Sequence, residues 1–163
     1  GDCICGRDSV SPLVGCRRPR PHMQSPALLR LMSDLKALED ESPAGVTASP
    51  INDGNLLEWN ATIVGPEESA WEGGIFSLYI RFSPDYPARP PKIRFTSVVF
   101  HPNVYEDGSL CLDILDNNWK PVYTVSSILV SIRSLLTDPN PSSPANVTAA
   151  NLYRDDPRQY RRQ

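Results

Sequence analysis

The sequence lacks several features that whole classes of proteins need. No run of its 163 residues approaches the roughly 18 consecutive apolar residues of a membrane-spanning helix. Residues 1–24 also contain no apolar core of the roughly 7–15 residues that a secretory signal has. The net charge of −3, from 16 basic and 19 acidic residues, has the wrong sign for a general nucleic-acid binder. The composition therefore argues against a membrane partner and against direct binding of nucleic acid.

Cysteine is scarce outside the first residues. Cys3, Cys5 and Cys16 lie near the start, and only Cys111 belongs to the rest of the chain. A single cysteine cannot build a disulfide framework, which favours a reducing compartment. The spacing of the three early cysteines and His22 matches no common zinc-finger pattern, so we predict no metal site.

Proline, by contrast, is abundant, with 17 residues or about twice the share of an average protein. Residues 1–24 mix proline, glycine and arginine without periodicity. We interpret residues 1–22 as a disordered leader that need not be native to the working protein. The regular pattern begins after Met23, and its length predicts one domain over residues 23–163.

Hydrophobic periodicity in this domain predicts an α+β fold. A helix is expected from Ser25-Pro26 through residue 41, because a capping residue and a proline precede apolar residues at helical spacing. Short turns separate the strands that follow, so they are expected to form a four-stranded antiparallel meander. The expected strands are 45–48, 57–64, 75–82 and 92–97, and the expected later helices are 124–137, 145–154 and 157–163.

The long stretch between the fourth strand and the second helix is the anomaly. Residues 98–122 show little periodicity, and a compact domain rarely keeps such a loop unless it is functional. Asp107-Gly108 is a strong turn signal almost midway between Asn103 and Cys111, so folding there brings those two residues together. An amide N–H beside a thiol suits chemistry in which an acyl group sits on sulfur and its carbonyl gains negative charge.

The residues by themselves leave a plainer interpretation open. A lone cysteine is often a buried filler, and an asparagine before a turn often satisfies backbone groups. His101 is the only histidine of the domain, and its neighbour Pro102 favours a role in holding the loop. Without a clear base, the Cys111 thiol is better suited to carrying an activated acyl group than to attacking an unactivated amide.

Several separate motifs surround this loop in a specific order. His101-Pro102-Asn103 precedes Cys111, which lies eight residues after Asn103, and Trp119-Lys120-Pro121 begins eight residues after Cys111. Residues 86–91 read YPARPP and residues 138–141 read DPNP. Together the motifs resemble the active-site signature of ubiquitin-conjugating enzymes, over about residues 23–163. Segments 103–115 and 140–146 most resemble the postreplication-repair branch of that family, which modifies histones and the replication sliding clamp.

The resemblance implies roles for individual residues. Cys111 would accept the C-terminus of ubiquitin from an activating enzyme as a thioester, which a substrate lysine or a ligase cysteine would then attack. Asn103 would steady the oxyanion or order the loop, and Asp113 would help to position the incoming lysine. Ser143 stands where many relatives carry an acid that helps to deprotonate lysine, so transfer should depend more on a ligase. Phosphorylation of Ser143 would add negative charge there, and we hypothesise that it tunes activity.

The resemblance also implies supporting residues and partners. Loop support is expected from His101, Pro102 and Trp119, and one cis bond is expected among the prolines of residues 86–91. By analogy, a ligase would bind at Ala88, Arg89, Pro121 and Val122. The expected partners are ubiquitin, the activating enzyme, a ligase and a protein substrate such as a histone or the sliding clamp, in the cytoplasm and nucleus. No cofactor is expected, and because the sequence shows no nucleotide-binding loop, a partner must supply the ATP chemistry.

The sequence departs from the family pattern in two places. Leu28 and Leu29 stand on the first helix where the repair branch carries cations that meet the activating enzyme and ligases, so those contacts are expected to differ. The last helix is expected to be truncated at Gln163.

Two other functions compete with the conjugating enzyme. A non-catalytic ubiquitin-handling module of the same fold would lack the cysteine, so Cys111 in an intact loop favours the enzyme. A carrier of a small ubiquitin-like modifier would have an insertion between the cysteine and the tryptophan. Eight residues from Cys111 to Trp119 leave no room for that insertion, which favours ubiquitin.

Overall fold

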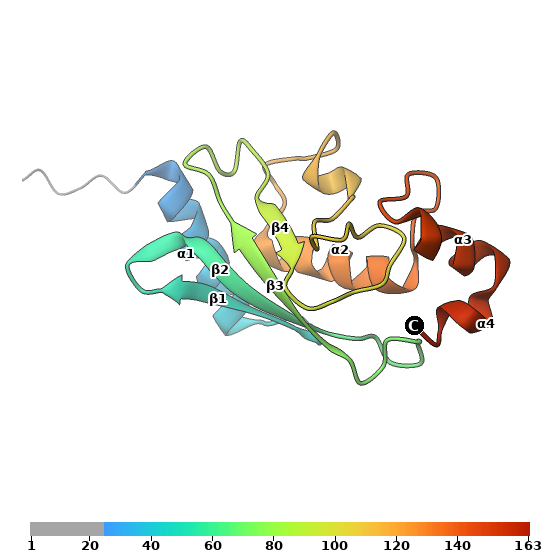
Figure 1. The fold of residues 1–163 in the computed structure, drawn as a ribbon. Helices are drawn as coiled ribbons and strands as arrows, with labels where there is room; N and C mark the ends of the chain where they lie inside the picture. The colour runs from blue at the N-terminus through green and yellow to red at the C-terminus, as the bar shows by residue number, and fades with distance from the viewer. Residues whose placement is uncertain (1–24) are drawn as a thin grey trace, which may run out of the picture.

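The computed structural model describes residues 25–163 (Figure 1). The predicted leader 1–22, its cysteines and the predicted start at Met23 lie outside the described residues. Within the described part, one helix is followed by four strands, a long loop with one 3₁₀ turn, and further helices. The predicted α+β class is therefore confirmed.

The first helix, α1, spans Pro26–Asp40 and begins as its sequence predicts. The Ser25 hydroxyl accepts a hydrogen bond from the backbone N–H of Leu28 at 3.3 Å, and proline occupies the first turn, where its missing N–H costs nothing. Leu28 is half-buried, whereas the Leu29 side chain is 54% exposed. The second of the two leucines that replace expected cations therefore stays outside the core.

The four strands form one antiparallel sheet in the order β1-β2-β3-β4, which confirms the predicted meander. They span Val46–Asn52, Asn55–Val64, Ile75–Arg81 and Lys92–Phe95. The predicted first strand, 45–48, was too short because Pro50 argues against a strand. Pro50 is tolerated because β1 lies at the edge of the sheet, and the register shifts between Pro50 and Asn52.

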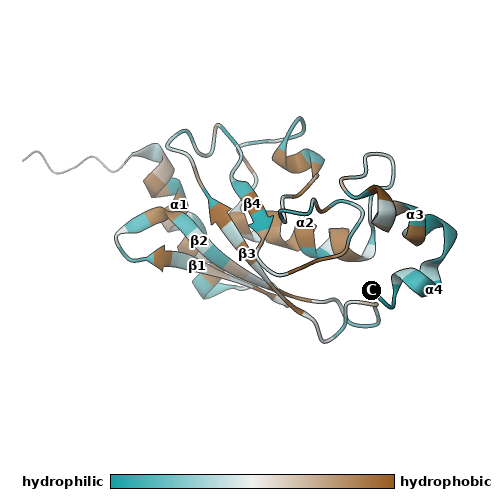
Figure 2. Cartoon of the chain, in the orientation of Figure 1, coloured by the Kyte–Doolittle hydropathy of each residue, from teal (hydrophilic) through white to brown (hydrophobic). Residues whose placement is uncertain are grey.

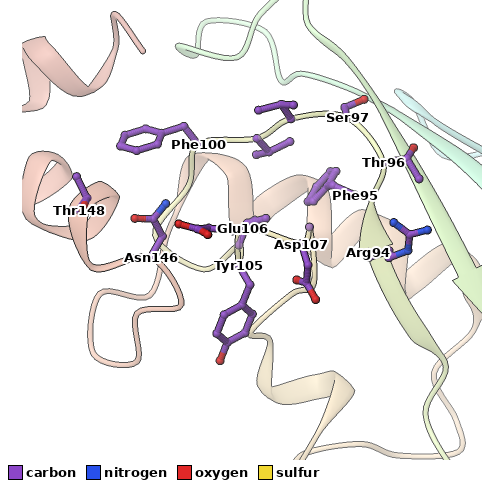
Figure 3. A pocket seen from close by; sticks show the side chains of 14 residues that line it. Arg94, Phe95, Thr96, Ser97, Phe100, Tyr105, Glu106, Asp107, Asn146 and Thr148 are labelled. Atoms are coloured by element: carbon purple, nitrogen blue, oxygen red, sulfur yellow. The ribbon is translucent and has the colours of Figure 1, made fainter.

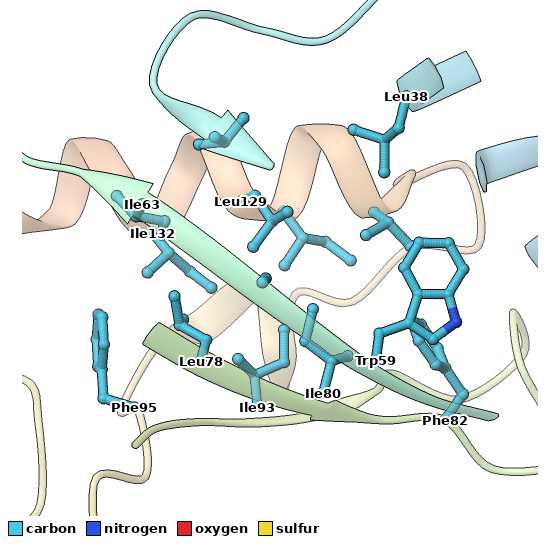
Figure 4. Packing of buried hydrophobic residues seen from close by; sticks show 14 of the residues in the cluster. Leu38, Trp59, Ile63, Leu78, Ile80, Phe82, Ile93, Phe95, Leu129 and Ile132 are labelled. Carbon is cyan, nitrogen blue, oxygen red and sulfur yellow. The ribbon is translucent and has the colours of Figure 1, made fainter. Parts of the chain in front are cut away.

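The core lies between the sheet and the second helix, α2, which spans Val125–Thr137 (Figure 4). Thr124 and Ser127 form a reciprocal capping box that begins this helix, each side chain bonding the other residue's backbone N–H. Leu129 and Ile132 are fully buried against the sheet. Each such side chain contributes about 1.5–3 kcal/mol by leaving water, so the α2–sheet interface is the rigid base beneath the long loop.

Two shorter helices, α3 (Val147–Asp155) and α4 (Pro157–Tyr160), lie at the opposite end of the molecule from α1 (Figure 1). Helix α3 begins two residues later than predicted because Asn146 caps it, accepting from the N–H of Ala149 at 3.0 Å. Hydrophilic colour dominates α4, whereas hydrophobic colour dominates α2 (Figure 2). No helix in the described part of the chain has the length and apolar character to cross a membrane.

Candidate active site

The loop after β4 folds back on itself around the predicted Asp107-Gly108 turn. The backbone N–H of Tyr105 donates to the carbonyl of Ser109, and the N–H of Cys111 donates to the carbonyl of Asn103, both at 2.9 Å. Asn103 and Cys111 therefore lie side by side across a narrow backbone ladder, as the turn signal indicates.

Glycine is required at the tip of this turn. Gly108 has φ +84°, and a Cβ there would overlap the carbonyl oxygen of Phe95. The Gly108 carbonyl accepts from the N–H of Phe95 at 2.8 Å, which joins the turn to the end of β4. The sheet thus holds the loop that carries Cys111.

The side chain of Asn103 joins this loop to the segment after α2. It is only 1% exposed, and its Oδ1 accepts from the Asn140 N–H at 2.8 Å. Its Nδ2 donates to the carbonyl of Asn140 at 2.7 Å and, at the longer distance of 3.4 Å, to that of Ser143. Three hydrogen bonds of this side chain thus join residue 103 to residues 140–143.

The thiol of Cys111 meets the same segment. Cys111 is half-buried, and its Sγ lies 3.5 Å from the carbonyl oxygen of Ser143. This is the oxygen that also accepts the longer bond from Nδ2 of Asn103. The amide N–H and the thiol therefore converge on one oxygen atom, which places the side chain of Asn103 close to the thiol.

His101 and Pro102 anchor the beginning of the loop. The imidazole is fully buried, with Nε2 2.8 Å from the carbonyl oxygen of Leu135 and Nδ1 accepting from the N–H of Asn103 at 3.0 Å. Burial lowers the pKa of His101 to about 4, so the ring is neutral near pH 7 and donates from Nε2. Both nitrogens are occupied, and neither is free to act as a base toward the thiol.

Pro102 fixes the same two segments through its backbone. Its carbonyl oxygen accepts from the N–H groups of Ala145 and Asn146, at 2.8 and 3.0 Å. The 101–111 loop and the 140–146 segment are thus joined at Pro102, Asn103 and Cys111.

Ser143 and Asp113 occupy different positions relative to the thiol. Ser143 is exposed and reaches Cys111 through its backbone carbonyl. Asp113 is exposed at the start of a 3₁₀ turn, Asp113–Leu115, and its carboxylate accepts from the Ile114 N–H and from Nδ2 of Asn118, both at 3.0 Å. The structure brings Cys111, Asn103 and Ser143 together, whereas the hydrogen bonds of Asp113 remain within its own loop.

Trp119 connects the two segments for which a ligase contact is expected. Its Nε1 donates to the carbonyl of Pro87 at 2.9 Å, and its ring lies against the rings of Tyr86 and Tyr123. The Tyr86–Pro87 bond is cis, so the expected cis bond is confirmed. The four expected ligase residues are all exposed: Ala88, Arg89, Pro121 and Val122.

Sequence reasoning missed Arg30 and Asp34 on α1. Asp34 is 4% exposed and bonds three groups from different parts of the chain, Arg30, Tyr86 and Val125. The available signal was an acidic residue on the apolar stripe of Leu31, Leu35 and Leu38, because a charge is rarely buried without partners.

A pocket of about 500 Å³ adjoins the turn (Figure 3). Its walls come from residues 94–100, from residues 104–108 and from Asn146 and Thr148 near the start of α3, and Cys111 is not among them. Within residues 25–163, no group of three or more His, Cys, Asp or Glu side chains is placed to hold a metal ion.

Known proteins resemble this chain along most of its length. Residues 30–163 match the family model for ubiquitin-conjugating enzyme. The chain is 52% identical over 140 residues to ubiquitin-conjugating enzyme E2 3 of Arabidopsis thaliana, covering 86% of this chain and 93% of that protein. It is 56% identical over 138 residues to ubiquitin-conjugating enzyme E2 2 of Debaryomyces hansenii, covering 85% of this chain and 82% of that protein. The chain therefore belongs to the ubiquitin-conjugating enzyme family, and it works with an activating enzyme and a ligase, accepting ubiquitin as a thioester and transferring it onward.

Proposed function

We propose that Cys111 is the residue that carries ubiquitin and that its thioester is discharged to a lysine of a protein substrate. The observation that supports this most is the convergence of Sγ of Cys111 and Nδ2 of Asn103 on the carbonyl oxygen of Ser143. In the transfer, the neutral lysine amine attacks the thioester carbonyl carbon, a C–N amide bond forms and the C–S bond breaks. The proton that the nitrogen loses passes to the departing sulfur or to solvent.

Two neighbours of Cys111 assist this step in different ways. Asn103 holds the 140–143 segment beside the thiol, and the longer of its two Nδ2 bonds is the one that can turn toward an oxyanion. Ser143 stands beside the thiol at the position where many relatives carry an acid, which we call the gate position. Because serine has no carboxylate, a ligase must contribute more to lysine discharge. Phosphorylation of this exposed residue adds negative charge and tunes the rate. Asp113, on the turn that follows Cys111, helps to position the incoming lysine.

The ligase binds where the 86–89 and 119–123 segments meet. Ala88 and Arg89 contribute from the first segment, and Pro121 and Val122 from the second. The hydrogen bond from Trp119 to Pro87 supports one continuous surface, and the Val122 side chain, 73% exposed, supplies apolar area for a partner.

The biological setting is that of the postreplication-repair branch. The substrates are histones or the sliding clamp, and the enzyme acts in DNA repair, in the nucleus as well as the cytoplasm. The support is the resemblance of two segments to that branch: residues 103–115, which contain Cys111, and residues 140–146, which contain Ser143.

The assignment of Cys111 is tested with ubiquitin, activating enzyme and ATP. The wild-type chain should form an adduct that thiol reagents cleave, and Cys111→Ala should form none. The matched control replaces Cys3, Cys5 and Cys16 with serine, which should leave the adduct intact. An adduct that survives Cys111→Ala would overturn the assignment.

The substrate class is tested separately with the charged enzyme. Nucleosomes and the sliding clamp are each incubated with the thioester and a ligase that stimulates its discharge. Modification of either one supports the repair setting, and modification of neither, while free lysine still discharges the thioester, contradicts it.

A further inference from the structure

Arg30 extends from α1 to the segment that carries Pro121 and Val122. Its Nη1 donates to the carbonyl of Pro121 at 2.9 Å, and its Nη2 donates to that of Tyr123 at 2.9 Å and to that of Val122 at 3.5 Å. One guanidinium thus binds the backbone carbonyls of three consecutive residues, using the fixed fork that only arginine offers. The position of this loop relative to α1 is set by that fork.

Asp34 holds the other side of the same guanidinium. Its Oδ1 accepts from Nε of Arg30 at 3.0 Å, which orients the fork. Its Oδ2 accepts from the Tyr86 hydroxyl at 2.8 Å and from the N–H of Val125, the first residue of α2, at 3.3 Å. The carboxylate is buried, and removing one partner of a buried charge is strongly destabilising. The carboxylate therefore keeps all three contacts, and they fix its geometry.

The Arg30–Asp34 pair therefore binds both segments of the proposed ligase surface. It holds Pro121 and Val122 through Arg30, and it holds the segment of Ala88 and Arg89 through the hydroxyl of Tyr86. The two segments contact each other through Trp119 and Pro87. The four docking residues are exposed, while the ion pair on α1 bonds the backbone of Pro121 and Val122 directly and reaches the 86–89 segment through the side chain of Tyr86.

We propose that Arg30 and Asp34 are positioning residues that fix the relative placement of the two ligase-binding segments, an inference that rests on the ligase surface proposed above. The pair lies on α1 and touches neither the thiol nor the residues around it. Its effect is therefore on recognition of the ligase, because the affinity of an interface depends on preorganised side chains at its centre.

The test replaces Arg30 with glutamine and compares it with Arg133→Gln. Arg133 is a matched control, because its Nε also donates to a backbone carbonyl, that of Val64 at 2.9 Å, at the far end of the sheet. Each enzyme is charged with ubiquitin, purified as the thioester, and discharged to free lysine with and without the RING domain of a ligase chosen because it stimulates the wild type. Starting from purified thioester removes any effect of α1 on charging by the activating enzyme.

In Arg30→Gln the ratio of ligase-stimulated to ligase-free discharge should fall about tenfold, through weaker binding of the RING domain. Arg133→Gln should keep the wild-type ratio, even if both variants unfold at the same lower urea concentration. Arg30→Lys should recover the unfolding midpoint, because the charge beside Asp34 returns, but not the ratio, because an ammonium cannot bind three carbonyls as the fork does.

The Trp119 indole N–H reports on the geometry itself. Its NMR resonance should shift in Arg30→Gln and in Tyr86→Phe, which removes the hydroxyl that bonds Asp34, and should stay in place in Arg133→Gln. If no RING domain that is screened stimulates or binds the wild type, the proposed ligase surface and this inference with it are overturned. If the wild type binds the RING domain, and Arg30→Gln has the same ratio of ligase-stimulated to ligase-free discharge and an unshifted indole resonance, the inference alone is overturned.

Discussion

The buried imidazole of His101 makes the stability of this enzyme depend on pH in a calculable way. Between about pH 6.5 and pH 4, the unfolded chain binds a proton at this residue and the folded chain does not, because burial lowers the folded pKa to about 4. Lowering the pH therefore favours the unfolded state. The contribution is complete above about pH 6.5 and is lost as the pH falls to about 4.

The magnitude follows from the difference between the two pKa values. From 6.5 to about 4 is a difference of about 2.5, and at about 1.36 kcal/mol for each pKa unit this equals about 3 kcal/mol of unfolding free energy. The steepest loss is about 1.4 kcal/mol per pH unit. A protonated ring would also lose the hydrogen bond that Nδ1 accepts from the N–H of Asn103, so the acid-sensitive part of the fold is the loop that carries Cys111.

The assay is urea unfolding followed by tryptophan fluorescence, at intervals between about pH 4.5 and pH 8. The matched variant is His101→Gln, whose amide can still donate to the Leu135 carbonyl but cannot take up a proton. This variant should have a lower free energy of unfolding than the wild type at pH 8, and that free energy should change much less with pH. Exposed carboxylates with lowered pKa values, such as Asp107, contribute equally to both proteins and cancel in the difference. Parallel curves for the two proteins would refute the reasoning.

Three further predictions concern the loop around Cys111. Asn103→Ala should still charge with ubiquitin but discharge to lysine roughly 10²-fold more slowly, because the variant loses three part-buried hydrogen bonds, worth about 1 kcal/mol each, that hold residues 140–143 beside the thiol. Asn140→Ala is the control, because it removes only the hydrogen bond that the Asn140 side chain accepts from the Ser142 N–H. An equally slow discharge in this control would assign the effect to the order of the 140–143 segment and not to the Asn103 amide. Ser143→Asp should discharge up to about tenfold faster, less than a fully positioned base provides, and a rate no higher than the wild type's would count against the gate role. Gly108→Ala should lower the free energy of unfolding by at least about 1–3 kcal/mol from backbone strain, measured in urea, and an unchanged midpoint would show that the turn adapts.

The local patterns of the sequence predicted a large part of this structure. Apolar spacing placed α1 and α2, the capping residue Ser25 marked where α1 begins, and α2 begins one residue after the predicted start at Thr124. The Asp107-Gly108 turn predicted the pairing of Asn103 with Cys111, because a turn relates residues that are close along the chain. The strand whose predicted bounds differ most from the structure, β1, contains a proline that is acceptable only at a sheet edge, and strand order is a tertiary property.

The sequence by itself determined which segments form helices and strands, which loop carries the thiol, and which family the chain resembles. Each of these depends on short motifs and on the spacing of residues that are close along the chain. Tertiary structure decided which distant segment meets the thiol and what holds the proposed ligase surface. The amide of Asn103 bonds backbone 37 residues away, Asp34 accepts from a tyrosine 52 residues away, and Arg30 binds a carbonyl 91 residues away. Hydrogen bonds of this range leave no periodic trace in the sequence. Two of the three partners are backbone carbonyls, which every residue possesses, and the third is a tyrosine hydroxyl far along the chain. Only the folding of the chain brings these groups together.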